Sequence, residues 1–107
     1  MLFNERDCLN YDPFQGDEMD VKELSNKIVT SRTEHKCNIC WELIPPKSRI
    51  RALREINREE QKVATFYFCT ECCVAMASSW TDNGRSITQR TVKGMAASGN
   101  WPVHVSP

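Results

Sequence analysis

Four cysteines stand in two pairs, and each pair has the spacing of a metal-binding motif. Cys37 and Cys40 form the first Cys-x-x-Cys pair, Cys69 and Cys72 form the second, and 28 residues lie between the pairs. Two intervening residues let one tight turn direct both sulfurs at a single point. Structural zinc is held by a closed tetrahedron of sulfur or nitrogen ligands. We therefore predict one zinc ion bound by these four thiolates.

Two other interpretations use the same cysteines. Iron–sulfur clusters are also held by four thiolates. A thioredoxin-like redox site uses one Cys-x-x-Cys pair at a strand-to-helix junction in a βαβ unit. Two pairs with a predicted hairpin between them favour zinc over both. Iron–sulfur ligation is the stronger of the two alternatives.

Three further residues could compete for the metal. Cys73 is adjacent to Cys72, but one step along a helix turns a side chain by about 100°, so only one of them can face the ion. The two-residue spacing favours Cys72, and we expect Cys73 and Cys8 to be structural. His35 is expected to be a surface histidine or to contact a ligand, because four thiolates already complete the shell.

The segment before the first cysteine pair divides into two parts. Residues 1–19 lack a sustained hydrophobic period and are expected to be irregular, with aromatic side chains packed on the core. Asp20 and Glu23 resemble a capping box, and apolar residues recur at helical spacing after Asp20. This pattern predicts an N-terminal helix from Asp20 to residues 30–32.

The remaining elements follow from alternation, turn residues and helix stop signals. They are, in chain order, a strand at Ser48–Leu53, a hairpin tip within Glu55–Lys62, a strand at Val63–Phe68, a helix over Cys72–Trp80 and a helix from Ser86 to about Ala97. Asn83-Gly84 is predicted to end the first of these helices. Residues 100–107 are expected to form an extended tail.

A cysteine knuckle, a β-hairpin and a second cysteine pair opening a helix occur in this order in treble-clef zinc fingers, which residues 35–80 resemble. The resemblance implies that Cys37 and Cys40 lie on the knuckle. It places Cys69 and Cys72 at a helix N-terminus, where free backbone N–H groups favour thiolates. The implied fold class is α+β: a small zinc-stabilised treble-clef-like domain with an N-terminal helix and a C-terminal helical extension.

A second resemblance concerns the knuckle segment Cys-Asn-Ile-Cys-Trp-Glu-Leu-Ile-Pro-Pro-Lys, which is similar to small uncharacterised zinc proteins of bacteriophages. Those proteins usually carry a glycine a few residues after the isoleucine, where this chain has Lys47 or Ser48. We expect a single domain over 1–107, composed of an acidic lead and helix at 1–34, a zinc module at 35–80, and a C-terminal helix and tail at 81–107.

Length and composition are typical of a small domain that a metal stabilises. The chain has 107 residues, of which 40% are hydrophobic and 8% aromatic, so its core is marginal without a metal or partner. No apolar run approaches the roughly 20 residues of a membrane span, and the N-terminus lacks signal-peptide features. We expect a cytoplasmic protein, in the host cytoplasm if it is phage-encoded, where thiols stay reduced.

Catalytic motifs are missing from the sequence. His35 and His104 are the only histidines, and they do not form the pair with which treble-clef nucleases hold a catalytic metal. The chain has no phosphate-binding glycine loop and no nucleophile elbow. A closed four-thiolate site also leaves no coordination position for water. We therefore predict a non-enzymatic protein.

A protein partner is the first binding hypothesis. Residues 1–25 carry seven acidic residues against two basic ones. We expect Trp41 and Trp80 in the core and Trp101 as an exposed anchor, because aromatic side chains carry much of the energy at interfaces. The phage resemblance suggests an inhibitor of a host defence enzyme, whose basic groove an acidic surface could occupy.

Nucleic acid is the alternative partner. Basic residues gather on the predicted hairpin: Lys47, Arg49, Arg51, Arg54, Arg58 and Lys62. Arg49 and Arg51 alternate onto one strand face, as in a phosphate-contacting ribbon, and Arg85, Arg90 and Lys93 could add a second patch. Three glutamates dilute the hairpin charge and the net charge is zero, so a protein partner is favoured. The oligomeric state stays open.

Overall fold

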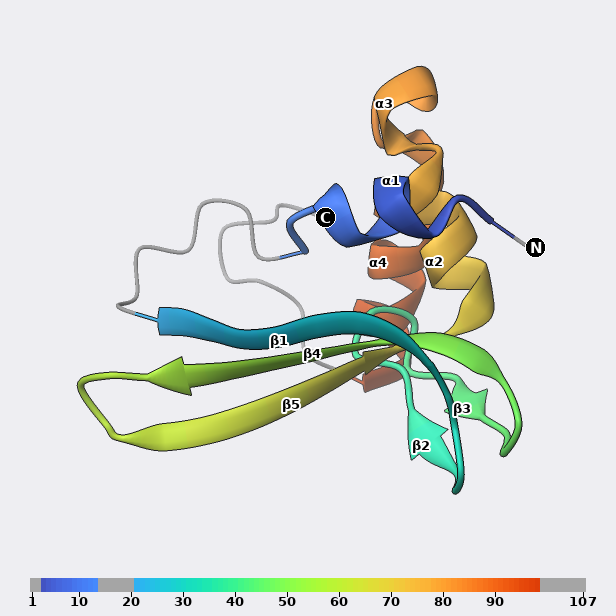
Figure 1. Cartoon of the computed structure of the whole chain (residues 1–107). Helices are drawn as coiled ribbons and strands as arrows, with labels where there is room; N and C mark the ends of the chain where they lie inside the picture. Colours follow the sequence, from blue (N-terminus) through green and yellow to red (C-terminus); the bar gives the residue numbers. More distant parts are fainter. Residues whose placement is uncertain (1–2, 14–20, 99–107) are drawn as a thin grey trace.

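A three-stranded antiparallel sheet carries the rest of the fold. Its strand order is β1 (Val21–Thr30), β4 (Arg49–Asn57) and β5 (Lys62–Phe68). The central strand, β4, therefore pairs with β1 on one side and with β5 on the other. The structure is a computed structural model that describes residues 3–13 and 21–98. These residues form a small α+β domain (Figure 1).

The helices gather on one side of this sheet, and a short two-stranded ribbon lies on the other side (Figure 1). The ribbon pairs β2 (His35–Lys36) with β3 (Leu43–Ile44). The helices are α1 (Glu5–Asn10), α2 (Thr70–Ala77), α3 (Ser79–Asp82) and α4 (Arg85–Ser98). Cys37 and Cys40 lie on the turn between β2 and β3, and Cys69 and Cys72 lie where β5 passes into α2.

The predicted N-terminal helix is wrong. The segment Val21–Thr30 is strand β1, which pairs along β4 with a register shift between Glu23 and Ser25. Its last residues, Ile28, Val29 and Thr30, are β-branched and favour a strand. Pairing with the central strand outweighs the helical spacing of the apolar residues, because tertiary context overrides local propensity. The only N-terminal helix among the described residues is α1, in a segment expected to be irregular.

The hairpin and the C-terminal helix agree with the sequence-based expectations, but the helix predicted over Cys72–Trp80 is divided into α2, which begins at Thr70 and ends at Ala77, and α3. Strand β4 runs on to Asn57, so the hairpin tip is shorter than expected, and the Asn57 side chain accepts hydrogen bonds from the backbone N–H groups of Glu59 and Glu60. Asn83 (φ 56°) and Gly84 (φ 75°) adopt the left-handed conformation that ends α3. Helix α4 begins and ends within one residue of its predicted bounds.

A buried arginine joins α1 to the sheet. Arg51 on β4 is 2% exposed. Its guanidinium donates to the backbone carbonyls of Cys8 and Tyr11, both at 2.9 Å, and to the Asn26 side chain at 2.9 Å. These carbonyls lie at the C-terminal end of α1, where the helix dipole favours a cation. The buried charge is thus hydrogen-bonded, and it fixes α1 over the helix-facing side of the sheet.

Candidate metal centre

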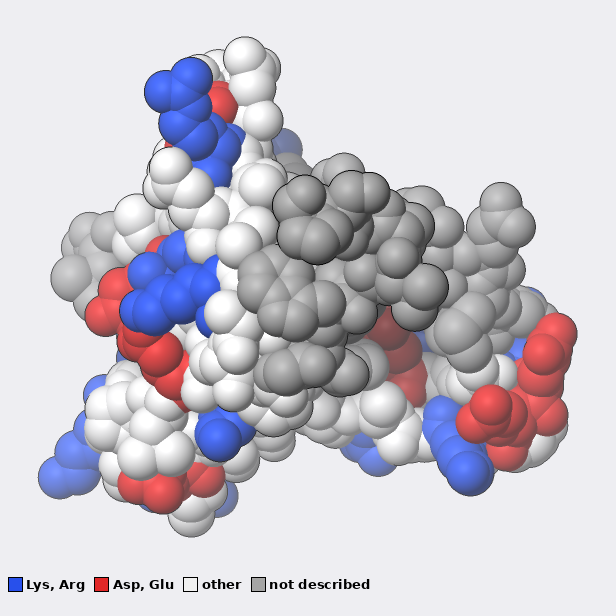
Figure 2. Space-filling view, turned by 180° about the vertical axis from the view of Figure 1, so that it is seen from behind, with Lys and Arg blue, Asp and Glu red and all other residues white. Residues whose placement is uncertain are grey.

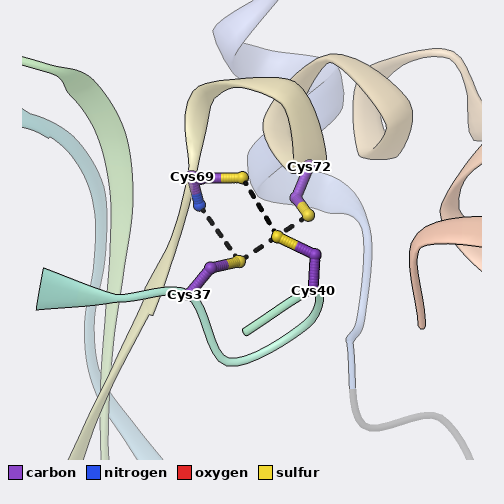
Figure 3. Close-up of side chains that lie close together, drawn as sticks. All are labelled: Cys37, Cys40, Cys69 and Cys72. Atoms are coloured by element: carbon purple, nitrogen blue, oxygen red, sulfur yellow. Dashed lines mark hydrogen bonds between the residues drawn. The ribbon is translucent and has the colours of Figure 1, made fainter. Parts of the chain in front are cut away.

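The four cysteines of the two motifs come together in one cluster. Their sulfur atoms all lie within 4.8 Å of one another, and all four residues are buried. Figure 3 shows the side chains pointing inward from two separate segments. The Cys37 and Cys72 sulfurs are 3.6 Å apart, as are those of Cys40 and Cys69. The pairs therefore contribute jointly to one site, and no pair forms a site alone.

These distances fit a single tetrahedral ion. Zinc–sulfur bonds of about 2.3 Å place the corners of a tetrahedron roughly 3.8 Å apart. A disulfide needs sulfurs about 2.05 Å apart. An iron–sulfur cluster places sulfides and several irons between the thiolates, so it would hold the cysteine sulfurs farther from one another. The donor set can hold one metal ion, and four sulfurs in a tetrahedron are a set that zinc prefers.

The first pair lies on a turn that is tied to the sheet. The Asn38 backbone N–H donates to the Tyr67 carbonyl at 2.8 Å, and the Tyr67 N–H donates to the Asn38 side chain at 3.0 Å. The turn closes with Trp41 in the left-handed conformation, at φ 62°. Cys37 and Cys40 thus hold their position because the knuckle is hydrogen-bonded directly to β5.

The second pair lies where β5 passes into α2. Cys69 is the N-cap residue of α2, and Cys72 lies in the first turn of that helix. Free N–H groups at a helix N-terminus stabilise thiolates. The Cys69 N–H donates to the Cys37 sulfur at 3.3 Å, and the Ile39 N–H donates to the same sulfur at 3.4 Å. Backbone donors from both motifs therefore offset the negative charge on Cys37.

Arg90 on α4 supplies the charged contact to the sulfurs. Its Nε donates to the Cys72 sulfur at 3.0 Å, and its Nη2 donates to the Cys69 sulfur at 3.7 Å. Partial burial opposes its charge, but the hydrogen bond to Cys72 and the thiolate charge raise the pKa of Arg90 above its usual range. Because a four-thiolate zinc site carries two negative charges, this guanidinium offsets part of them.

Close backbone packing brings α4 to the metal centre. A Cβ added to Gly94 would lie 1.7 Å from the Ile39 carbonyl oxygen and 2.9 Å from the Cys40 Cα. Only glycine fits there, so α4 lies directly against the knuckle. Lys93, the preceding residue, forms an ion pair with Glu42 after the knuckle. The helix therefore packs directly on the turn that carries Cys37 and Cys40.

The pKa values of the thiols show how the cluster behaves without a metal. Hydrogen bonds from Cys69 and Cys72 lower the pKa of Cys37. The hydrogen bond to Cys37 raises the pKa of Cys69 to about 12 and also raises the pKa of Cys72. Negative charge thus concentrates on Cys37, and a divalent cation is needed for Cys69 and Cys72 to ionise at neutral pH.

The competing residues lie outside the cluster. Cys73 turns away, and its thiol donates to the Phe68 carbonyl at 3.4 Å. Cys73 also hydrogen-bonds Cys8, which lowers the pKa of Cys8, and both thiols are fully buried. His35 stacks on the Tyr67 ring, with centroids 3.9 Å apart. The prediction that Cys72 and not Cys73 joins the cluster is confirmed.

Several other expectations need correction. Arg51 is buried under α1 and cannot contact phosphate from the sheet surface. Arg49 pairs with Glu5 at 3.4 Å, so the two arginines do not form an open ribbon. Trp41 is 39% exposed and Trp80 is 74% exposed, so neither is a core residue. Trp101 and His104 lie outside the described residues.

Arg90 and Gly94 are the functional residues that sequence reasoning missed. Arg90 was considered only as part of a second basic patch, and a single glycine in a helix is a weak signal. Figure 2 shows basic and acidic groups side by side on the face seen from behind. The contacts of Arg90 with Glu71 and of Lys93 with Glu42 fit this mixed pattern. The second patch is therefore not a continuous basic surface.

Comparison of the chain with protein-family models, with curated proteins and with solved structures finds no match. Among the described residues, no helix has the length and apolar character needed to cross a membrane.

Proposed function

We propose that the chain is a non-catalytic, zinc-stabilised interaction module of the treble-clef type that binds a protein partner. The buried four-cysteine cluster carries this proposal. Four protein thiolates complete a tetrahedral shell, so substrate and water have no coordination position to enter. The order of knuckle, hairpin and helix along residues 35–80 supports the treble-clef assignment.

The surface around Trp80 is the proposed contact with the protein partner. Trp80 is 74% exposed at the start of α3. Asp7, Tyr11 and Asp12 line a hollow of about 420 Å³ beside it. A large exposed aromatic side chain beside a hollow is a common arrangement for an anchor residue at a protein interface. The nearby aspartates favour a partner with a basic surface.

The class of partner follows from this charge and from the knuckle resemblance. The knuckle segment is similar to small bacteriophage zinc proteins, which makes a host enzyme the first class to test. A nuclease with a basic groove would attract the aspartates beside Trp80 and would lose access to nucleic acid when this module is bound.

The experiment uses a chain in which Trp41→Phe and Trp101→Phe leave Trp80 as the only tryptophan. Proteins captured from a host lysate are purified and titrated against it. The tryptophan emission should shift to the blue, and Trp80→Ala in the unmodified chain should weaken binding at least tenfold. Leu43→Ala, which removes a different exposed apolar side chain, is the matched control. Equal binding by the Trp80→Ala and Leu43→Ala proteins would refute the interface.

A further inference from the structure

Among the described residues, no helix covers one face of the sheet, and the charged residues on this face differ from those on the other. Residues paired across antiparallel strands point to the same face, and alternate residues point to opposite faces. Arg51 and Asn26 both contact α1, so their rows define the helix-facing side. The rows between them define the open face: Ala52 with Lys27 and Tyr67, Arg54 with Ser25 and Thr65, and Ile56 with Lys22 and Val63.

The open face is basic and carries no carboxylate in these three rows. Lys22, Lys27 and Arg54 are exposed there. Glu23 and Glu55, which are paired with each other, belong to the opposite, helix-facing side by the same alternation. A chain of zero net charge therefore presents a local positive surface that its overall composition conceals.

An aromatic pair lies at the end of the open face. The His35 ring stacks on Tyr67 at an interplanar angle of 16°. Beside this pair lies a groove of about 740 Å³, which is lined by Val29 of β1, Ala52 of β4, Arg32 of the segment after β1 and other residues. Ala52 is small, so the floor between Tyr67 and Lys27 stays low. Its described lining combines aliphatic side chains with the His35 and Tyr67 rings and with Arg32 and Arg49, and none of these lining residues is acidic.

We infer that this open face binds single-stranded nucleic acid. Flexible cations in successive rows, about 6.8 Å apart along the sheet, can follow a phosphate backbone. The groove and the exposed Val63 (47%) offer apolar surface to unstacked bases. Such surfaces bind single strands through charge and stacking together. A duplex fits less well, because its bases already stack inside the helix. This surface differs from the Trp80 surface and does not depend on the proposed protein partner.

An acidic peptide shares the charge of nucleic acid but not its rings. The stacked His35 and Tyr67 and the apolar groove favour the nucleic acid, because a peptide of glutamates would use only the cations. The distinction can be measured, since removal of a ring should affect one ligand and leave the other unchanged.

The test measures binding of a fluorescein-labelled oligothymidylate of about 20 nucleotides to the zinc-loaded chain by anisotropy. Three phosphate contacts predict that affinity falls roughly 20-fold between 50 and 200 mM salt. The variant Lys22→Gln, Lys27→Gln, Arg54→Gln should bind at least tenfold more weakly at low salt. The control Arg6→Gln, Lys62→Gln, Arg85→Gln removes the same charge elsewhere and should stay within about threefold of the wild type.

A ring variant completes the test. His35→Ala should weaken oligonucleotide binding about tenfold and leave binding of a labelled polyglutamate unchanged, with zinc content and circular dichroism confirming the fold. Absence of binding at low salt overturns the inference. Equal losses in the two triple variants overturn it too, because they indicate unspecific charge. Tighter binding of polyglutamate than of the oligonucleotide makes an acidic peptide the occupant and overturns it as well.

Discussion

The Nε of Arg90 lies 3.0 Å from the sulfur of Cys72, which joins the C-terminal helix directly to a metal ligand of α2. The same guanidinium reaches the Cys69 sulfur at 3.7 Å. Charge on the thiolates and the position of α4 are therefore connected.

Replacing Arg90 by glutamine should weaken zinc binding. The substitution removes a cation from a site with two excess negative charges, and contacts of this kind typically change metal affinity 10- to 100-fold. We expect a zinc affinity about tenfold lower, measured by competition with a chromogenic chelator at constant pH. Arg85→Gln, on the same helix and exposed, is the control. Equal affinities in the two variants would show that Arg90 has no effect on the metal.

Metal content and fold should depend on Cys40 and not on Cys73. We expect about one zinc per chain by elemental analysis. Cys40→Ser should lose tertiary structure, because a structural zinc site contributes on the order of 10 kcal/mol. Cys73→Ser should retain zinc, since its thiol faces the Phe68 carbonyl. A well-dispersed NMR spectrum of metal-free Cys40→Ser protein would contradict this prediction.

Zinc affinity should rise with pH through the neutral range. Without metal, the pKa of Cys69 is about 12 and the pKa of Cys72 is also raised, so both thiols hold protons at pH 7. Binding must release these protons, and a fall in pH therefore favours the metal-free form. Calorimetry in buffers of different ionisation enthalpy should detect at least two protons released. An affinity that does not change between pH 6 and pH 8 would refute this proton release.

Gly94→Ala should destabilise the protein. Helix propensity alone predicts a gain of about 1 kcal/mol for this change. The added Cβ would lie 1.7 Å from the Ile39 carbonyl oxygen, and we expect the clash to outweigh the gain, with a net loss of roughly 3 kcal/mol. Chemical denaturation of the zinc-loaded protein measures the difference. Thr88→Ala, at an exposed site of α4, should change stability little, and a more stable Gly94→Ala protein would contradict the packing.

Arg51→Met should cost far more stability than Arg49→Met. The first substitution leaves the carbonyls of Cys8 and Tyr11 without their buried donor, at a cost of about 3 kcal/mol. Arg49 forms a partly exposed pair with Glu5, whose loss should cost about 0.5 kcal/mol. Urea denaturation compares them. Similar losses would mean that the Arg51 contacts contribute little to stability.

The sequence was sufficient to predict the cysteine cluster, because ligand spacing is a local property. Cys37 and Cys72 meet as expected since each pair lies on a turn or helix end that its own neighbours determine. The strand Val21–Thr30 was not predictable in this way. Its conformation depends on hydrogen bonds to β4, whose paired residues lie 19 (Thr30 with Arg49) to 36 (Val21 with Asn57) positions later, and its apolar residues also fit a helical period.

The exposure of the tryptophans and the basic face of the sheet could not be predicted from the sequence for a related reason. The exposure of Trp80 depends on how the rest of the fold packs around α3, and composition does not specify this packing. Lys27 and Arg54 are far apart in sequence and become neighbours only through the register of β1 on β4. Alternation along one predicted strand put Arg49 and Arg51 on the same face, whereas strand pairing brings Arg54 together with Lys22 and Lys27 on the opposite face.

Gly94 also determines where the Arg90 side chain lies. The two residues are four apart, so they lie one above the other on the same side of α4. Gly94 is the only glycine in α4, and the knuckle accepts no side chain at the point of contact. A helix displaced by one turn, about 5.4 Å, would bring Arg90 or Ser98 against the Ile39 carbonyl. The absence of a side chain at Gly94 thus restricts α4 to one position along the knuckle. In that position the Arg90 guanidinium contacts the sulfurs of Cys69 and Cys72.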